Sequence, residues 1–395
     1  MNSYLVKSIS FLLVFFPVAL LSGSFFSDLF ASMSSLLFLI YIIRNKEWKY
    51  FNNIFFKVFV LFYIYLVIRE LFSGYNPSTF FYIRFVLFSL AINFIIDKDN
   101  LFLKNFLLVS VLTVIIIFID SLSIIVFEKN ILYQEPFNKY RLSSFLYDEL
   151  KLGSLLLRLS PVIFAVFVYE KLKKNKVLAS KDFIYLIGLY LAILIIIIKS
   201  GERASLILFF IATIIFFLCS GFLKIKYSFL IIFLSFFIVV LFFLNNKYLF
   251  IRYAEQFSLN SSSSFLEDHI GLFKASFLMF QDNPIFGNGL KTFRILCANY
   301  LSFGCTTHPH NTYLESLSEI GIFGFFFILF FFLLITYFLI QNFFNKSYNF
   351  SCVFLLSVSF INLFPFTTTG SFYGNWLSLL YYLPVGFLIN FSKKK

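Results

Sequence analysis

Charged residues are scarce in this chain: Asp, Glu, Lys and Arg make up only 13% of its 395 residues, against about 25% in soluble domains. Hydrophobic residues make up 60%, and 65 residues are Phe. So few polar side chains cannot cover a water-soluble core of this size. The composition therefore excludes an ordinary soluble domain and places the chain in the membrane class.

Twelve apolar stretches follow one another along the chain, each about 15–25 residues long, which is the length of a helix that crosses a bilayer. The first stretch is followed at once by the second and lacks a small-residue cleavage site, so we interpret it as a retained span. The sequence predicts an all-α polytopic membrane protein in which residues 1–395 form one integral membrane domain. The twelve stretches are residues 8–22, 25–43, 54–72, 79–96, 101–119, 150–169, 182–198, 204–219, 228–244, 313–340, 350–364 and 372–390.

Acidic residues are the scarcer charge type, 19 against 32 basic residues, which gives a net charge of +13. Such an excess can indicate nucleic-acid binding, but here the basic residues follow a membrane topology. With the N-terminus inside, the inner segments hold seventeen Lys and Arg residues and the short outer loops hold five. The positive-inside rule then places both termini in the cytoplasm and residues 120–149 and 245–312 outside. We expect membrane lipid, and no nucleic acid, as a partner.

Only four residues are Cys. Cys219 and Cys352 fall in or at the edge of spans, where a small apolar thiol needs no further reason. Cys297 and Cys305 lie eight positions apart in the outer loop, where an oxidising compartment favours a disulfide. The outer loop has no CxxC or His-x3-His spacing, so no metal site is expected there.

Histidine is rarer still, and all three histidines lie within residues 245–312. His269 falls in the stretch 265–280, whose apolar residues recur at helical spacing and predict an amphipathic helix at the membrane–water boundary. The Ser run at residues 261–264 that precedes this stretch is interpreted as a linker. Asn311 is a good N-cap for a span beginning at Thr312. The positive end of that helix disfavours imidazolium, so His310 is expected to stay neutral and able to accept a proton.

His308, which lies beyond the end of that helix, is expected to matter less than His310. Gly321 and Gly324 are expected to lie on one helix face and to pack closely against another span.

Charges inside spans are costly and therefore mark candidate functional sites. Arg203 follows a Gly in a very tight turn between two spans, which favours a functional role. Arg158 lies in mid-span, and either snorkels toward the membrane boundary, pairs with Asp120 or Asp28, or contacts a substrate. Arg69 and Glu70 are interpreted as a structural ion pair. These charges and Arg84 gather toward the outer face, with Arg141 at its edge.

The segment that begins at His310 resembles the O-antigen ligase/polymerase superfamily of bacterial envelope glycosyltransferases. His310 and Asn311 are followed by nine residues, Gly321, two residues and Gly324, which matches the pattern of the ligase branch. Arg203 matches the arginine of a second pattern, Arg-x3-Leu, although Ile207 replaces the Leu. The segment NPIFGNGLKTF is similar to a Pro- and Gly-containing segment of the same family.

The resemblance implies a GT-C-like fold with the long periplasmic loop between the ninth and tenth spans. It implies an inverting, metal-independent and cofactor-free transfer of a glycan from a polyprenyl-diphosphate carrier to a lipid A–core sugar hydroxyl, at the periplasmic face of the bacterial inner membrane. His310 would act as the base and Arg203 would bind the diphosphate. His269 stands where the family carries a further arginine. The remaining candidate substrate-binding residues are Arg84, Arg141, Arg158, Lys291, Arg294 and Asn311.

Two alternatives remain open at this point. The first is an O-antigen polymerase that joins carrier-linked repeat units. The paired Arg-x10-Gly loops of that branch are absent, because Leu152 stands eleven positions after Arg141. The second is a transporter or flippase, since twelve spans with both ends inside is a common carrier layout. Carriers have matched halves and midplane sites, whereas the polar residues here gather at the outer boundary.

Overall fold

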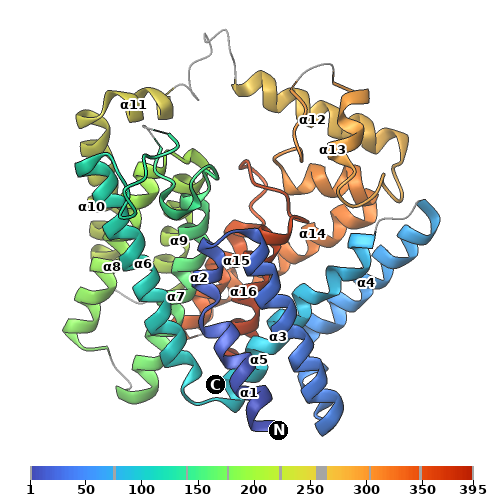
Figure 1. Ribbon diagram of the computed structural model, residues 1–395, viewed down its shortest axis with the longest axis horizontal. Helices are drawn as coiled ribbons and strands as arrows, with labels where there is room; N and C mark the ends of the chain where they lie inside the picture. Colours follow the sequence, from blue (N-terminus) through green and yellow to red (C-terminus); the bar gives the residue numbers. More distant parts are fainter. Residues whose placement is uncertain are drawn as a thin grey trace.

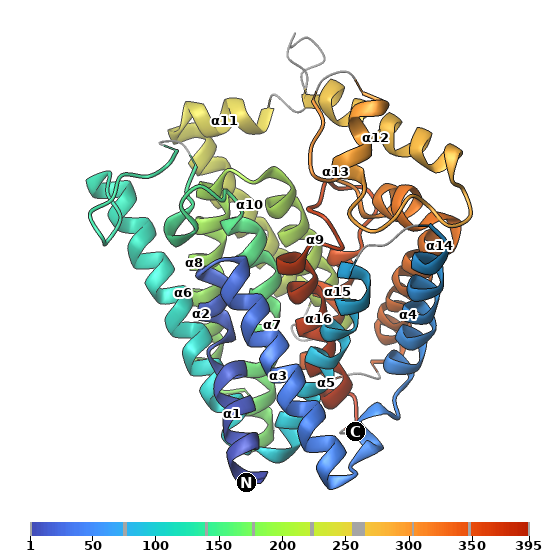
Figure 2. The same ribbon diagram turned by 45° about the vertical axis from the view of Figure 1, so that its right-hand side comes forward.

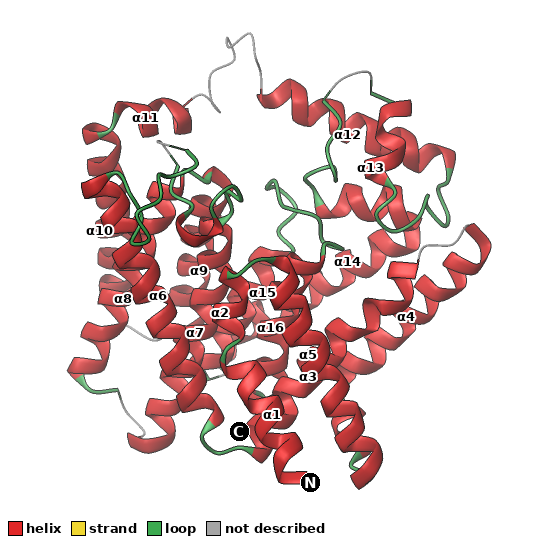
Figure 3. Cartoon of the chain, viewed as in Figure 1, coloured by secondary structure: helices red, strands yellow, loops and turns green. Residues whose placement is uncertain are grey.

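The computed structural model describes residues 2–73, 77–138, 141–175, 178–221, 225–254, 265–301, 304–346 and 349–393. These residues form helices joined by loops and include no strand (Figure 3). Short 3₁₀ turns occur at Trp48–Phe51, Pro77–Tyr82, Ser144–Leu146 and Cys297–Asn299. The α-helices are α1 Asn2–Val14, α2 Phe16–Leu21, α3 Ser24–Asn45, α4 Ile54–Ser73, α5 Ile83–Lys98, α6 Phe102–Phe127, α7 Leu152–Asn175, α8 Ser180–Ser200, α9 Arg203–Ser220, α10 Ile225–Asn245, α11 Lys247–Ala254, α12 Phe265–Asp282, α13 Phe293–Leu296, α14 Thr312–Asn345, α15 Phe350–Asn362 and α16 Asn375–Phe391.

Eight helices in the described part of the chain are long and apolar enough to cross a membrane, so the protein is an all-helical polytopic membrane protein. One of them is the segment Thr79–Lys98, which contains α5. The other seven are α3, α6, α7, α8, α9, α10 and α14. The other four predicted spans coincide with α1–α2, α4, α15 and α16. Those elements are interrupted, carry several charges or have fewer than 18 residues, so the count of twelve spans stays a prediction.

Four helices form the centre of the bundle, namely α5, α7, α15 and α16 (Figures 1 and 2). Every residue from Phe85 to Ile96 on α5 is buried. Helices that are apolar all round are typical of such buried positions. The peripheral helices expose large hydrophobic side chains instead, for example Phe127 on α6 and Leu244 on α10, which is the pattern expected of a lipid-facing surface.

Close approach of α5 and α16 depends on a small residue and on polar contacts, as is common between helices in lipid. A Cβ added at Gly386 would lie 2.7 Å from the Ile92 side chain and from the Ser89 carbonyl oxygen. The Ser89 hydroxyl donates a hydrogen bond to the Tyr382 carbonyl oxygen at 2.7 Å. These contacts fix the centre of the bundle, on which the candidate site is built.

The two ends of the molecule differ. Helix α1 and the last turn of α16 lie at one end, which we call the terminal end. At the opposite end, which we call the site end, α11 and α12 lie across the tops of the other helices (Figures 1 and 2). At the site end, α6, α8, α10 and α11 stand on one side, and α4, α12, α13 and α14 stand on the other.

Helix α14 is interrupted at Gly321, whose backbone has φ +73° and ψ −166°. The prediction that Gly321 and Gly324 share one helix face is therefore wrong. The segment that approaches Gly321 is the loop after α12, since a Cβ there would lie 2.2 Å from the Ile285 carbonyl oxygen. The three atoms nearest to a Cβ added at Gly324 all belong to Ile320 of the same helix. Only Gly readily adopts the backbone conformation found at Gly321, so the break in α14 requires a Gly at this position.

The loop after α12 satisfies the backbone groups that the break leaves open. The Asn288 N–H donates to the Ser318 carbonyl oxygen at 3.0 Å, and the Gly289 N–H donates to the Glu319 carbonyl oxygen at 2.7 Å. The Tyr65 hydroxyl donates to the Ile320 carbonyl oxygen at 2.5 Å. Buried backbone groups need such partners. The first turns of α14, residues 312–320, are therefore a separate segment at the site end.

Candidate functional site

The three histidines of the chain lie together at the site end. The ring centroids of His308 and His310 are 4.2 Å apart, and those of His269 and His310 are 5.1 Å apart. His269 comes from α12, which confirms the predicted helix over 265–280, and the other two come from the segment before α14. The face that α12 buries carries Leu272 and Met279. Sequence analysis gave His308 a minor part, but the fold places its ring directly beside His310.

Backbone contacts hold His310 in an unusual conformation. Its φ is +57°, in the left-handed region that side-chain-bearing residues seldom adopt. The Thr369 N–H donates to the His310 carbonyl oxygen at 2.9 Å. Asn311 is the N-cap of α14, as predicted, and its Oδ1 accepts from the N–H groups of Tyr313 and Leu314. Its Nδ2 also donates to the Pro365 carbonyl oxygen at 3.0 Å.

The surroundings of the histidines favour the neutral imidazole. Burial lowers the pKa of His310. Burial also lowers the pKa of His308 to about 4, with smaller contributions from His310, Arg294 and His269. A neutral imidazole has a free lone pair on one ring nitrogen and can accept a proton from a hydroxyl group. The cluster can therefore supply a base near neutral pH.

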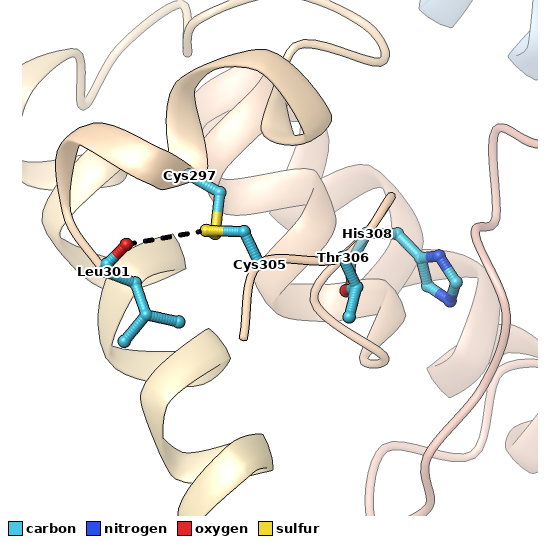
Figure 4. The surroundings of a disulfide bond; sticks show 5 residues. All are labelled: Cys297, Leu301, Cys305, Thr306 and His308. Carbon is cyan, nitrogen blue, oxygen red and sulfur yellow. Dashed lines mark hydrogen bonds between the residues drawn. A yellow bond between two sulfur atoms is a disulfide. The ribbon is translucent and has the colours of Figure 1, made fainter. Parts of the chain in front are cut away.

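A disulfide joins Cys297 and Cys305 just before the histidines, with a Cα–Cα distance of 5.9 Å. Figure 4 shows this bond and, farther along the same segment, the His308 ring turned away from it. The Thr306 hydroxyl donates to the His308 carbonyl oxygen at 2.7 Å, and Thr307 Oγ1 lies 2.9 Å from His308 Nδ1. The disulfide and these turns fix the path of the chain into the histidine cluster.

Two predicted cations lie close to this cluster. Arg294 is exposed and near enough to His308 to lower its pKa. Burial lowers the pKa of Lys291, and Arg84 and Arg294 lower that pKa further. Lys291 Nζ donates to Asn375 Oδ1 at 3.1 Å. Arg294 therefore places positive charge beside His308, and Lys291 lies near Arg294 and Arg84.

Arg84 is engaged in a different way. It forms an ion pair with Asp28, with 2.9 Å between Nε and Oδ1, and it lies over the Phe85 ring at 4.4 Å. Asn375 Nδ2 donates to the other Asp28 oxygen at 3.2 Å and so connects this pair to Lys291. The position of Arg84 suits a structural part in supporting Lys291.

A second group of cations surrounds the turn between α8 and α9. Arg203 is the first residue of α9, and Gly201 makes the turn with φ +66°. Arg141 Nε donates to the Ser200 carbonyl oxygen at 3.2 Å. Arg252 Nε donates to the Gly201 carbonyl oxygen at 2.9 Å. We call Arg141, Arg203 and Arg252 the arginine group. Sequence analysis missed Arg252, because nothing in the sequence relates it to a turn fifty residues earlier.

The acid at this turn, Glu202, is held by hydrogen bonds from neighbouring groups. The Glu202 carboxylate accepts from the N–H groups of Gly153 and Ser154 at 2.6 and 3.0 Å, and from the Ser205 hydroxyl at 2.9 Å. Within the described residues, Arg141 and Arg252 form no salt bridge. Burial lowers the pKa of Arg141, and so does the charge of Arg252. Such a concentration of positive charge suits an anion.

Two charges within spans have structural partners. Arg69 Nη1 and Glu70 Oε2 are 2.9 Å apart and buried, which confirms the predicted ion pair. The predicted pairing of Arg158 with an acid is wrong. Arg158 Nη1 donates to Ser154 Oγ at 2.5 Å, and its guanidinium lies 5.5 Å from the centre of the Tyr381 ring. Asp120 accepts hydrogen bonds from the loop after α6 instead.

The histidine cluster and the arginine group stand on different sides of the site end. In both views the outer ends of α9 and α14 are apart, and the loop that follows α15 lies between them (Figures 1 and 2). The same two helices meet near the terminal end, where Asn342 Nδ2 donates to the Cys219 carbonyl oxygen at 2.9 Å. In the described part of the chain, no group of three or more His, Cys, Asp or Glu residues could hold a metal ion.

Fold and site together define a polytopic membrane protein, all-helical in its described residues, that gathers histidines and arginines at one end. The family model described as O-Antigen ligase matches residues 188–329. Residues 188–329 are therefore similar to the O-antigen ligase family, which confirms the resemblance drawn from the His310 and Arg203 motifs. A comparison with curated proteins gives no match. The matched range runs from α8 into α14, so Arg141 and Thr369 lie outside it.

Proposed function

We propose that this protein is a glycosyltransferase that moves a glycan from a polyprenyl-diphosphate carrier to a sugar hydroxyl. The observation that carries this proposal is the histidine cluster, in which His310 is half-buried, has a lowered pKa and is held by backbone contacts. A sugar hydroxyl must lose a proton as it attacks the anomeric carbon, and a neutral imidazole is suited to accept it. His310 is the proposed base.

The arginine group is proposed to bind the diphosphate of the donor. A diphosphate is already a good leaving group, so the reaction needs cations that stabilise its developing charge. Arginine binds phosphate oxygens through a planar fork of N–H groups. Arg141 and Arg252 direct part of that fork to carbonyl oxygens, which orients both residues on the turn that bears Arg203. Lys291 and Arg294 offer a second, smaller group of cations on the histidine side.

The proposed orientation places the site end on the periplasmic side of the bacterial inner membrane and both termini in the cytoplasm. The distribution of Lys and Arg along the sequence supports it. Single cysteines at Glu135 and Lys104, which are both exposed, provide the test. A membrane-impermeant maleimide should label Glu135→Cys in intact spheroplasts and Lys104→Cys only after lysis. Labelling of both before lysis would overturn the orientation.

The proposed acceptor is a lipid A–core sugar, which makes the protein an O-antigen ligase. The test uses the purified protein in vesicles with a polyprenyl-diphosphate-linked glycan and lipid A–core. Appearance of the glycan on the core supports the ligase. Longer carrier-linked chains without core product would indicate a polymerase, and movement of the donor across the bilayer without bond formation would indicate a flippase.

Loss of the gene offers a check in cells. A ligase-deficient strain should accumulate long glycan chains that are not attached to core. Core carrying a single repeat unit would instead identify the protein as a polymerase.

A further inference from the structure

The first turns of α14 are bonded at several points to the loop 363–374 between α15 and α16, which we call the strap. The Tyr313 hydroxyl donates to the Leu363 carbonyl oxygen at 2.7 Å. The hydroxyl groups of Ser316 and Tyr373 are 2.9 Å apart. Together with the bonds of His310 and Asn311 to the strap, these contacts hold the strap against the start of α14. The strap lies outside the range that the family model matches.

One charged side chain joins the strap to α14. Glu315 is 2% exposed, and its two carboxylate oxygens accept hydrogen bonds from the Ser371 hydroxyl and from the Phe372 N–H, the latter at 2.8 Å. A buried carboxyl group is costly unless such donors satisfy it. Glu315 is therefore the residue that ties residues 371–372 of the strap to the helix.

Residues 369–372 of the strap connect His310, which Thr369 contacts, to Glu315, which Ser371 and Phe372 contact. The Thr369 N–H holds the His310 carbonyl oxygen at 2.9 Å, and the Thr369 and Thr312 hydroxyl groups are 3.2 Å apart in a buried position. A left-handed backbone at a residue such as His310 persists only when its surroundings impose it. The strap supplies that constraint, and Glu315 anchors the strap.

We propose that Glu315 is a positioning residue for the transfer reaction: through the strap it fixes the backbone of His310 and so the direction of its imidazole ring. This inference rests on the proposed function of His310. Glu315 contacts the strap and not the imidazole, so it acts through Thr369.

Glu319, one turn farther along α14, is a natural comparison. It is 1% exposed and accepts hydrogen bonds from the N–H groups of Lys291 and Phe293 at 2.7 and 3.1 Å. It therefore ties down the segment that bears Lys291 and Arg294, while Glu315 ties down the strap. The two acids occupy one helix and are equally buried, but they should affect different kinetic parameters.

The test compares variants of the full-length protein in the transfer assay. Glu315→Ala should lower kcat on the order of 10²-fold, since a small misplacement of a catalytic group has an effect of that size. The donor KM should change less than threefold, because the arginine group is untouched. Glu315→Gln keeps the shape and one acceptor oxygen and should recover at least tenfold of the loss. Glu319→Gln should raise the donor KM more than it lowers kcat.

Two strap variants keep the inference testable if Glu315→Ala does not fold. Thr369→Pro removes the N–H that holds His310 and should lower kcat as Glu315→Ala does. Thr368→Pro leaves that N–H in place and should keep more than half of the normal turnover. Equal turnover of these two variants would overturn the inference, as would normal kcat in Glu315→Ala.

Hydrogen exchange separates failure of this inference from failure of the proposed function, because it needs no turnover. Glu315→Ala should expose the amides of residues 369–372 to exchange, while those of the first turns of α14 stay protected. Unchanged protection of the strap overturns the inference. Normal turnover of His310→Ala, with the strap loosened as expected in Glu315→Ala, would instead overturn the proposed role of His310.

Discussion

The histidine cluster and the arginine group are built in opposite ways. His310 is held by its backbone, through the Thr369 N–H and the Asn311 cap, and its ring is left to do chemistry. Arg141 and Arg252 are held by their side chains, which use part of their N–H groups on carbonyl oxygens. A base must point toward the hydroxyl whose proton it accepts, whereas a cation needs mainly to lie close to the anion that it binds. The two constructions match these two needs.

The electrostatic surroundings of the histidine cluster and the arginine group also differ. Around the histidines, burial lowers the pKa of His310 and lowers the pKa of His308 to about 4. Around the turn at Gly201, the charges of Arg141 and Arg252 repel each other, and the Glu202 carboxylate is taken up by α7 and by Ser205. The histidine cluster therefore offers a lone pair that can accept a proton, and the arginine group offers positive charge. The predictions below test this division, from the largest effect to the smallest.

Loss of the base should have the largest effect. General-base catalysis is worth about 10²–10⁴-fold, so His310→Ala should lower kcat by that factor and leave donor binding unchanged. Single-turnover transfer and donor binding by the purified variant provide the measurement. Lys104→Ala, at the terminal end, is the control. A chelator should leave the normal enzyme active, and its inhibition, or near-normal turnover of His310→Ala, would contradict the mechanism.

Changes in the arginine group should act on the donor. Arg203→Lys keeps the charge but loses the planar fork that contacts two phosphate oxygens, so the donor KM should rise about tenfold with a smaller fall in kcat. Arg252→Ala should act in the same direction and more weakly. Arg44→Lys at the terminal end serves as the matched control. A loss confined to kcat would place Arg203 with the base rather than with the donor.

The positions of most helices along the chain could be predicted from the sequence, because apolar length and turn residues are local signals. The Asn311 cap, the helix over 265–280 and the Arg69–Glu70 pair were predicted in this way and are confirmed. Each depends on residues that are close together in the chain.

The break in α14 and the strap could not be predicted in that way. Gly321 and Gly324 have the spacing of a helical packing face, and only the approach of Ile285 from another segment shows that Gly321 ends a helical turn instead. The Arg158 pairing failed for a related reason, since Arg158 Nη1 donates to Ser154 one turn away and not to a distant acid. Glu315 was overlooked because its partners lie 56 and 57 residues away.

The pH dependence of turnover should report on the histidine side alone. Neutral imidazole is the active form of the base, so activity is lost as pH falls and His310 becomes protonated. Burial lowers the pKa of His310, so the midpoint of the acidic limb of kcat should lie below about 6.5, the ordinary value for histidine. His308, with a pKa lowered to about 4, should stay neutral over that range. A midpoint above 6.5 would show that His310 is not shielded from water as the structure places it.

Removal of the disulfide should have the smallest effect on catalysis. Cys297→Ser or Cys305→Ser opens a short loop, which typically costs about 2–3 kcal/mol of stability. The loss should appear as a lower unfolding temperature. Turnover should fall only a few-fold, because Thr369 and Asn311 hold His310 without help from the disulfide. Cys219→Ser, which replaces a buried free thiol, is the control for the substitution itself.

Mass spectrometry of non-reduced, alkylated protein should find Cys297 and Cys305 linked. If both react with the alkylating agent, the predicted disulfide is absent. If loss of the disulfide abolishes turnover as His310→Ala does, the backbone contacts of the strap are not sufficient to hold the base.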